Sequence, residues 1–289
     1  MENKKNITVF GATGKIGSDL IRLLSEAQIE TIAVTRNIEK AVKLPFVEWM
    51  QADLSDKQSL YETLKNSNSV FLLSGHSADF VEGQKNVVEV AKELGVKHIV
   101  KLSSGAADKN SQFHIPKTHG EVEEFLKLSG LHYTMLRPYG IMQNWLGDIA
   151  DSIRKEKKFY EATGNGKRAH VDRRDIAEVA FKCLVEPEKH YDKVYLLTSD
   201  KAVNYQEVAE AISKTINEKV EYVAISINEA RQEMQRNGMP NALIETFISY
   251  DEAQRNGQTE IISNSVRTVL EKPARTLENF VTDYADYFK

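Results

Sequence analysis

The sequence predicts an α/β fold: a doubly wound parallel Rossmann sheet with a smaller, mostly helical substrate lobe. Two observations predict the sheet. Short apolar runs alternate with segments of helical period through the first half of the chain, and a glycine-rich turn follows the first of these runs. A third observation predicts the lobe, because the segments beyond Asp200 are mostly of helical period.

Strands are predicted where short β-branched and apolar runs stop at a turn signal. Gly11 closes the first run, and Pro138 stops the sixth. The predicted strands cover residues 7–10, 31–35, 47–50, 70–73, 98–102 and 132–136, with a late seventh strand at 194–197.

Helices are predicted where apolar residues recur about three or four positions apart. In the first helix Ile16, Leu20 and Leu24 share one face, and Gly95 and Gly130 close two of the later ones. The helices expected between strands cover residues 15–26, 57–65, 79–94, 117–128 and 172–184. Those expected beyond the last strand cover residues 205–216, 227–235, 241–257 and 276–288.

Alternating strands and helices form right-handed βαβ units, and ligands bind at the carboxyl ends of such strands. We expect residues 1–138 plus 171–199 to form the Rossmann domain. Residues 139–170 plus 200–289 are expected to form the substrate-binding lobe. Because the sequence contains no long linker, this lobe is expected to be built from insertions after the sixth and seventh strands and not to be a tethered domain.

Composition excludes several classes of protein. One cysteine in 289 residues rules out an internal disulfide and any multi-cysteine metal site, and we expect Cys183 to be a small core residue. His114 and His119 lie five apart, off one helical face, so no metal is expected. A net charge of −4 gives no reason to expect nucleic acid.

Nothing in the sequence indicates a membrane partner or a targeting segment. No stretch approaches the ~18 apolar residues of a transmembrane helix, and the first apolar run is too short for a signal peptide. The cytoplasm is therefore the expected location, which suits a lone thiol. The sequence carries no signal for an oligomeric state.

The glycine-rich turn, GATGKIG at residues 11–17, predicts a dinucleotide site. Gly11 permits the tight turn, Gly14 lets a pyrophosphate approach the backbone, and Gly17 lets the helix pack against the sheet. Free N–H groups at the helix N-terminus then hold the anion. The cradle is expected to be lined by Thr13, Lys15 and Ile16. The alternative is a turn that binds no ligand.

The end of the second strand predicts NADPH in preference to NADH. An acid there would bind the ribose 2′-hydroxyl, whereas this chain has Arg36, which suits a 2′-phosphate, with Lys40 in reach. The alternative is a solvated arginine. Asp53, followed by Leu54, is expected to accept from the adenine amino group, unless it only caps the next helix. The stretch beside the adenosine and pyrophosphate is Ser74, Gly75 and His76.

Together these motifs resemble the NmrA-like, atypical short-chain dehydrogenase/reductase family. The resemblance also rests on SSG at 103–105, Lys117 with Glu121, YTMLRP at 133–138 and HVDRRDIAEVAFKCL at 170–184. It covers roughly residues 6–197. The family includes type-two quinone oxidoreductases, triphenylmethane-dye reductases and NmrA redox-sensing regulators.

The resemblance implies further site residues. Lys117 would be the catalytic residue that contacts the nicotinamide ribose, although a solvent-facing helix lysine is the alternative. Ser103, Pro138 and Tyr139 would lie near the nicotinamide. The substrate pocket would begin with Tyr139, Met142, Asn144 and Trp145, with core packing as the alternative for Tyr139 and Trp145.

One departure from the wider superfamily concerns the general acid. Related dehydrogenases carry Tyr-x-x-x-Lys, whereas this chain has Phe113 four residues before Lys117. A phenyl ring cannot move a hydroxyl proton, which argues against sugar epimerisation and ordinary carbonyl chemistry. A quinone or cationic dye stabilises the incoming charge itself.

We therefore predict an NAD(P)H-binding reductase that transfers hydride to a small-molecule electrophile such as a quinone or dye. An NmrA-type NAD(P) redox sensor that does not turn over is the alternative. A nucleoside-diphosphate-sugar epimerase is a weaker one.

Overall fold

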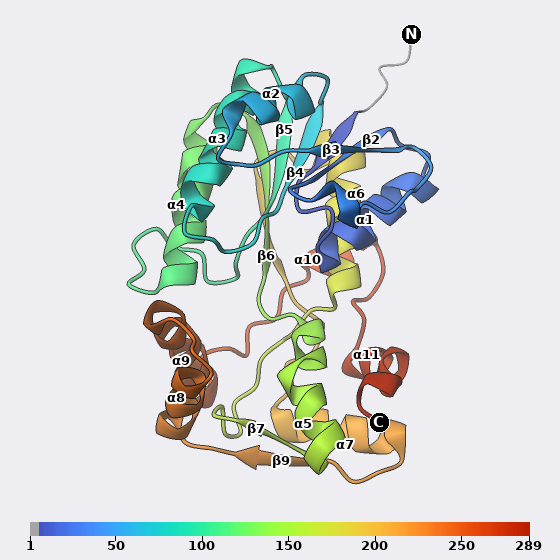
Figure 1. Ribbon diagram of the computed structural model, residues 1–289. Coiled ribbons are helices and arrows are strands. Elements are labelled where there is room, and N and C mark those ends of the chain that lie inside the picture. Colours follow the sequence, from blue (N-terminus) through green and yellow to red (C-terminus); the bar gives the residue numbers. More distant parts are fainter. Residues whose placement is uncertain (1–5) are drawn as a thin grey trace. The chain divides into compact units, whose positions relative to one another are not determined.

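A seven-stranded sheet organises the first part of the chain, in the order β3-β2-β1-β4-β5-β6-β8 (Figure 1). The computed structural model describes residues 6–289. β1 to β6 pair in parallel, and Ile7 of β1 lies opposite both Thr31 of β2 and Ser69 of β4. The strands are β1 (Ile7–Val9), β2 (Thr31–Thr35), β3 (Val47–Gln51), β4 (Ser69–Leu72), β5 (His98–Leu102), β6 (His132–Pro138) and β8 (Lys193–Leu197).

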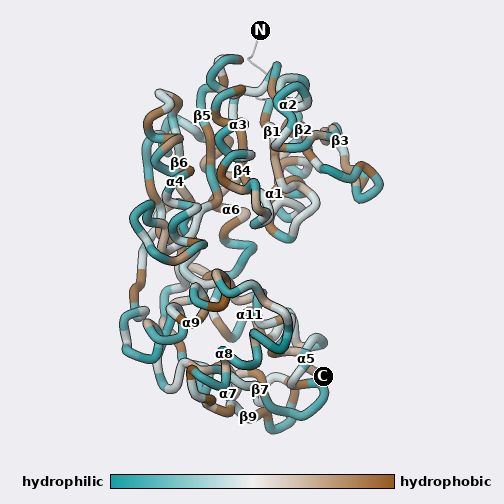
Figure 2. Tube along the Cα trace, turned by 60° about the vertical axis from the view of Figure 1, so that its left-hand side comes forward, coloured by the Kyte–Doolittle hydropathy of each residue, from teal (hydrophilic) through white to brown (hydrophobic). Residues whose placement is uncertain are grey.

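Helices cover both faces of this sheet, as a doubly wound Rossmann fold requires. Figure 1 shows α2, α3 and α4 on one face, with α1 and α6 on the other. Their bounds are α1 (Lys15–Glu26), α2 (Lys57–Leu64), α3 (Phe80–Glu93), α4 (His114–Leu128) and α6 (Arg173–Val185), with short 3₁₀ turns at Ile38–Lys40 and Pro187–Lys189. Figure 2 shows the apolar residues of β4 in brown, and all four residues of that strand are buried. The predicted fold class is confirmed.

The chain divides into two compact units. Unit 1 comprises Met1–Asn110, Pro116–Arg137 and Ile176–Leu196, and unit 2 comprises Ser111–Ile115, Pro138–Asp175 and Leu197–Lys289. Apolar side chains of β4, β5, α2 and α3 form a core in unit 1, in which Leu60, Val70 and Val87 are fully buried. That unit 2 binds substrate stays a proposal.

Unit 2 is built mainly from helices around a small parallel two-stranded sheet. The sheet pairs β7 (Lys158–Glu161) with β9 (Glu221–Ala224). The helices are α5 (Asp148–Glu156), α7 (Tyr205–Ile216), α8 (Ile227–Arg236), α9 (Asn241–Arg255), α10 (Ser265–Leu270) and α11 (Leu277–Asp283), with 3₁₀ turns at Met142–Leu146 and Ala285–Tyr287. Its core includes Trp145, Phe159 and Phe280.

Several elements of unit 2 differ from the expectation. The sequence did not predict β7 and β9, because a four-residue strand is too short to show a period. Helices α5 and α10 were also missed. The prediction of one helix over residues 276–288 is wrong, because α11 ends at Asp283 and a separate 3₁₀ turn follows it.

Local signals explain where other helices begin. Asn204 with Glu207 and Ser226 with Glu229 form capping boxes at the starts of α7 and α8. Asp172 accepts from the backbone N–H of Arg174 at 2.8 Å and so caps the start of α6. Cys183 is buried on the same helix, as expected. Among residues 6–289, no helix is long and apolar enough to cross a bilayer.

Candidate functional site

A cavity of about 560 Å³ lies at the carboxyl ends of β1, β2, β3 and β4 in unit 1. The chain turns away from β1 in one direction to β2, and β4 lies on its other side, so this is the topological switch point of the sheet. The cavity is lined by segments 10–16, 34–36, 52–54, 73–77 and the start of α3. Eleven predicted residues line it together: Gly11, Thr13, Gly14, Lys15, Ile16, Arg36, Asp53, Leu54, Ser74, Gly75 and His76.

The glycine turn fits the cavity because two of its glycines have no room for a side chain. Gly11 has a positive φ of 71°, and a Cβ there would lie 2.7 Å from the carbonyl oxygen of Leu73. A Cβ at Gly17 would lie 2.1 Å from the carbonyl oxygen of Gly11. Gly17 therefore does not line the cavity but lets α1 sit against the turn.

The N-terminus of α1 opens into this cavity. Gly14 is its N-cap, has an extended backbone and offers no side chain to cap the first turn. Lys15 and Ile16 of that turn line the cavity. Uncapped N–H groups and the helix dipole favour an anion at this position, so the residues present fit a pyrophosphate.

Arg36 and Asp53 stand at the ends of β2 and β3 on the cavity wall. Ser55 donates to the Asp53 carboxylate from its hydroxyl at 2.7 Å and from its backbone N–H at 2.9 Å. These two hydrogen bonds, with a smaller contribution from the Arg36 charge, lower the pKa of Asp53. Asp53 does not cap α2, since Asp56 does so through Gln58 N–H; that alternative for Asp53 was wrong.

A chain of buried hydrogen bonds runs from the sheet interior to the cavity wall. The Lys101 amine on β5 is buried, donates to the carbonyl oxygen of Leu102 at 3.0 Å and lies 2.9 Å from His119 Nδ1. His119 Nε2 lies 3.2 Å from Nε2 of His76, which lines the cavity. His76 also stacks on the Phe80 ring at 4.5 Å.

Burial sets the protonation of this chain. Desolvation lowers the pKa of Lys101 to about 7, against a smaller opposing effect of Glu123. Desolvation, with the Lys101 charge beside it, also holds the pKa of His119 far below its ordinary value. Sequence reasoning missed Lys101, although a charged residue inside the apolar run HIVKL of a central strand is a readable signal.

Two of the residues implied by the resemblance, Lys117 and Ser103, lie elsewhere in unit 1. Lys117 is exposed on the first turns of α4 and does not line the cavity. Ser103 is buried and donates to Glu123 Oε1 at 2.5 Å, and Arg137 Nε donates to the same oxygen at 2.9 Å. Ser103 is therefore held by the core of unit 1.

The remaining predicted residues belong to unit 2. Pro138 and Tyr139 are partly exposed and Asn144 is exposed. Met142 and Trp145 are 1% and 3% exposed, within the core of unit 2, and the Trp145 ring lies 4.7 Å from His170. The structure favours the packing alternative for Trp145, and Met142 takes no part in the site proposed below.

Among residues 6–289, no three metal-binding side chains gather into a possible metal site.

Comparison with known proteins places this geometry among redox proteins. Residues 3–281 match the model of the NmrA-like family. The chain is 33% identical to an NAD(P)H azoreductase of Xenophilus azovorans, over 98% of this chain and 99% of the relative.

Two solved structures share the fold over nearly their whole length. The Escherichia coli NADPH-dependent quinone oxidoreductase QOR2, solved with NADPH, superposes with a TM-score of 0.86 at 28% identity, covering 96% of this chain and 99% of that one. The Citrobacter sp. triphenylmethane reductase, solved with NADP(H), gives 0.83 at 25% identity, covering 97% and 99%.

Proposed function

Since this chain belongs to the NmrA-like family, we propose that it is an NADPH-dependent reductase of small aromatic electrophiles such as quinones or dyes. The cavity at the carboxyl ends of β1–β4 carries the proposal, because it gathers an anion-binding turn, Arg36 and Asp53. The azoreductase, quinone oxidoreductase and dye reductase among the similar proteins support this choice of acceptor.

Each part of the cavity suits one part of the dinucleotide. The turn at Gly11–Gly14 and the start of α1 would hold the pyrophosphate. Arg36 would pair with the 2′-phosphate, and Asp53 would accept from the adenine amino group. Ser74, Gly75 and His76 would line the adenosine and pyrophosphate side. Bound NADPH would supply the hydride, and Lys117, Ser103 and Pro138 are the residues proposed for its nicotinamide end.

Cofactor preference is tested by equilibrium binding. We expect a lower Kd for NADPH than for NADH. Arg36→Met should raise the NADPH Kd about tenfold, because one charge-assisted bond to the 2′-phosphate is lost, and should leave the NADH Kd nearly unchanged. Lys40, which was expected within reach of the 2′-phosphate, does not line the cavity. Arg236→Met, which alters an exposed arginine paired with Glu233, is the matched control. Equal affinities of the native protein for both cofactors would contradict the preference.

Turnover is tested by following NADPH oxidation with a naphthoquinone, methyl red and crystal violet. Acceptor-dependent oxidation well above background is expected. Tight NADPH binding with background turnover for every acceptor would favour the redox sensor. Isomerisation of a sugar nucleotide without net cofactor consumption would favour the epimerase.

The proposal needs a small-molecule partner and no nucleic acid. We place the protein in the cytoplasm, where NADPH is available as a reductant. Fractionation of cells that produce the tagged protein tests this, and recovery outside the cytoplasmic fraction would contradict it.

A further inference from the structure

A polar cluster in unit 2 surrounds the side chain of Arg168. This Arg168 cluster consists of Tyr139, Glu161, Arg168, Tyr250 and Asp251, and all five are partly exposed. Tyr139 follows β6, Glu161 ends β7, and Tyr250 and Asp251 lie on α9 (Figure 1).

The guanidinium of Arg168 is held beside two aromatic rings but keeps a donor unused. Its central carbon lies 5.9 Å from the Tyr139 ring centroid and 5.7 Å from that of Tyr250. Nη2 donates to the carbonyl oxygen of Tyr250 at 3.0 Å. Nε is buried and has no partner among the described residues. A buried donor without an acceptor is costly, so a ligand that supplies one would bind favourably.

Arg168 is fixed in place before any ligand arrives. Its backbone exchanges hydrogen bonds with Val203 at 3.0 and 3.1 Å. Its side chain passes so close to Gly140 that a Cβ there would lie 3.1 Å from Arg168 Cδ. Little conformational freedom therefore remains to be lost on binding, which favours affinity.

The two acids of the cluster differ in protonation. Burial raises the pKa of Glu161 to about 8, helped by the charges of Asp251 and Asp148 and opposed by Arg168. Burial raises the pKa of Asp251 to about 6, again opposed by Arg168. The phenols of Tyr205 on α7 and Tyr222 on β9 interact with the Glu161 carboxyl. Burial raises the pKa of both phenols, so they stay neutral near pH 7.

Two consequences follow at neutral pH. The Glu161 carboxyl is mainly protonated, so it can donate a hydrogen bond. Asp251 is mainly ionised and offsets the charge of Arg168, which leaves the cluster close to neutral. A doubly charged diphosphate would therefore find no surplus of positive charge here.

We propose that the Arg168 cluster binds the electron acceptor, a planar aromatic molecule of low charge that carries an oxygen or nitrogen acceptor, such as a quinone or an azo compound. The rings of Tyr139 and Tyr250 would pack on its plane. Arg168 Nε and the Glu161 carboxyl would donate to its polar atom. The inference rests on the proposed function for the identity of the acceptor, but binding can be measured without turnover.

The experiment measures binding of methyl red and of a naphthoquinone to the protein saturated with NADP⁺, by titration calorimetry and by the dye's absorbance shift. Arg168→Met should raise the Kd of both probes about tenfold or more, since a charge-assisted donor is removed. The NADP⁺ Kd should stay within about twofold, because Arg168 does not line the dinucleotide cavity. Arg236→Met, an exposed arginine on α8 paired with Glu233, is the matched control and should change neither Kd.

The pH profile isolates Glu161. Native affinity for the naphthoquinone should fall as pH rises through about 8, where Glu161 loses its proton. Glu161→Gln keeps a donor that does not titrate, so its affinity should stay level across that range. Glu156→Gln, which alters an exposed carboxylate, should keep the native profile.

Unchanged probe binding in Arg168→Met would overturn the proposal, and so would a native pH profile in Glu161→Gln. If Arg168→Met does not fold, as judged by circular dichroism, Arg168→Lys keeps the charge but lacks Nε and should show the same weakened binding. Probe binding that depends on Arg168 in a protein that never oxidises NADPH would refute the reductase and keep the site.

Discussion

Lys101 is a buried lysine that has no carboxylate beside it. The nearest acid on α4, Glu123, is already bound by Arg137 and Ser103. The amine contacts a carbonyl oxygen and an imidazole instead. Because an uncompensated buried charge is costly, the neutral amine is favoured, and the pKa falls from 10.5 to about 7.

The lowered pKa of Lys101 makes stability depend on pH in a defined direction. Between about pH 7 and 10 the unfolded chain holds this proton and the folded chain does not, so stability rises with pH across that window. Below pH 7 the full cost of charging the buried amine applies. In the native protein the free energy of unfolding should therefore rise by a few kcal/mol, to order of magnitude, across this pH window. Lys101→Met should remove that rise, as measured by urea unfolding at several pH values.

Lys97→Met is the control for that series, because Lys97 is exposed and directly precedes β5. This variant should keep the native dependence of unfolding free energy on pH, since Lys101 and the other groups that titrate in this range are unchanged. An equal slope in native protein and Lys101→Met would show that Lys101 stays charged in the fold.

At the scale of elements, the glycine turn at residues 11–17 depends on how closely α1 approaches the end of β1. The distance from a Cβ at Gly17 to the carbonyl carbon of Gly11 would be only 2.8 Å, and both are backbone positions that cannot rotate away. The glycine turn is thus a packing requirement as well as an anion site. Its sequence pattern was readable because Gly11 and Gly17, which meet here, lie within seven residues of one another in the chain.

Gly17→Ala should therefore separate α1 from the turn. We expect a loss of about 1–3 kcal/mol in unfolding free energy, the usual cost of overpacking, and at least tenfold weaker NADPH binding. Gly75→Ala serves as the comparison for stability, because a Cβ there meets nothing within 4 Å. Equal destabilisation by the two substitutions, measured by thermal and urea unfolding, would contradict this account of the turn.

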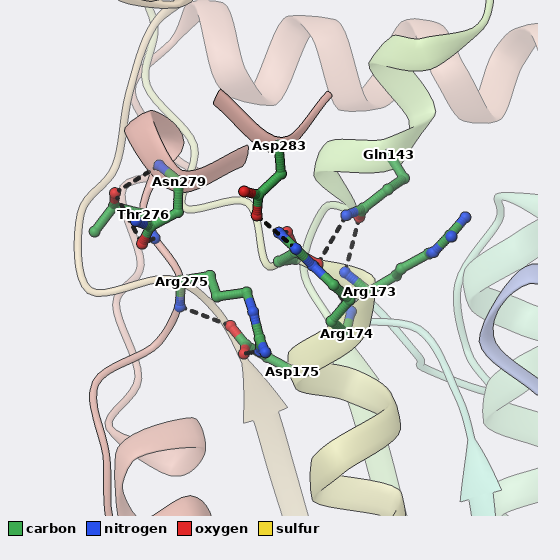
Figure 3. A network of polar contacts seen from close by, with 9 residues as sticks. Gln143, Arg173, Arg174, Asp175, Arg275, Thr276, Asn279 and Asp283 are labelled. Atoms are coloured by element: carbon green, nitrogen blue, oxygen red, sulfur yellow. Dashed lines mark hydrogen bonds and ion pairs between the residues drawn. The ribbon is translucent and has the colours of Figure 1, made fainter. Parts of the chain in front are cut away.

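At the scale of the whole chain, buried ion pairs fasten the C-terminal segment within unit 2 (Figure 3). Arg275 bonds the carboxylate of Asp175 through its side chain and, at 2.8 Å, through its backbone N–H. Arg174 joins Asp172 to Asp283 of α11, with its bond to Asp283 at 2.6 Å. Asp172 and Asp175 are both fully buried, so each needs its arginine.

Arg275→Ala should cost about 3–5 kcal/mol near pH 8, because it removes the cation that pairs with a buried carboxylate. The loss should shrink as pH falls, since burial raises the pKa of Asp175 and a protonated acid needs no cation. Arg267→Ala breaks an exposed pair with Asp200 and should cost less than about 1 kcal/mol. Similar losses from both substitutions in calorimetric unfolding would contradict this assignment.

The sequence alone determined the alternation of strands and helices, the glycine turn and the family resemblance. These depend on residues close together in the chain, such as Gly11 and Gly17, whose spacing states the geometry directly. The parallel sheet followed from the same local units, because strands that alternate with helices form βαβ units. The cavity residues at Arg36 and Asp53 were readable because the ends of parallel strands meet at one edge.

Only the tertiary structure decided which polar groups lose water and what they contact. Lys101 meets His119 across 18 positions, and Arg168 meets Tyr250 across 82. The sequence shows each of these residues as one more charge among 38 lysines and arginines. Burial, protonation and an unused donor depend on packing between distant segments, and no local pattern specifies that packing.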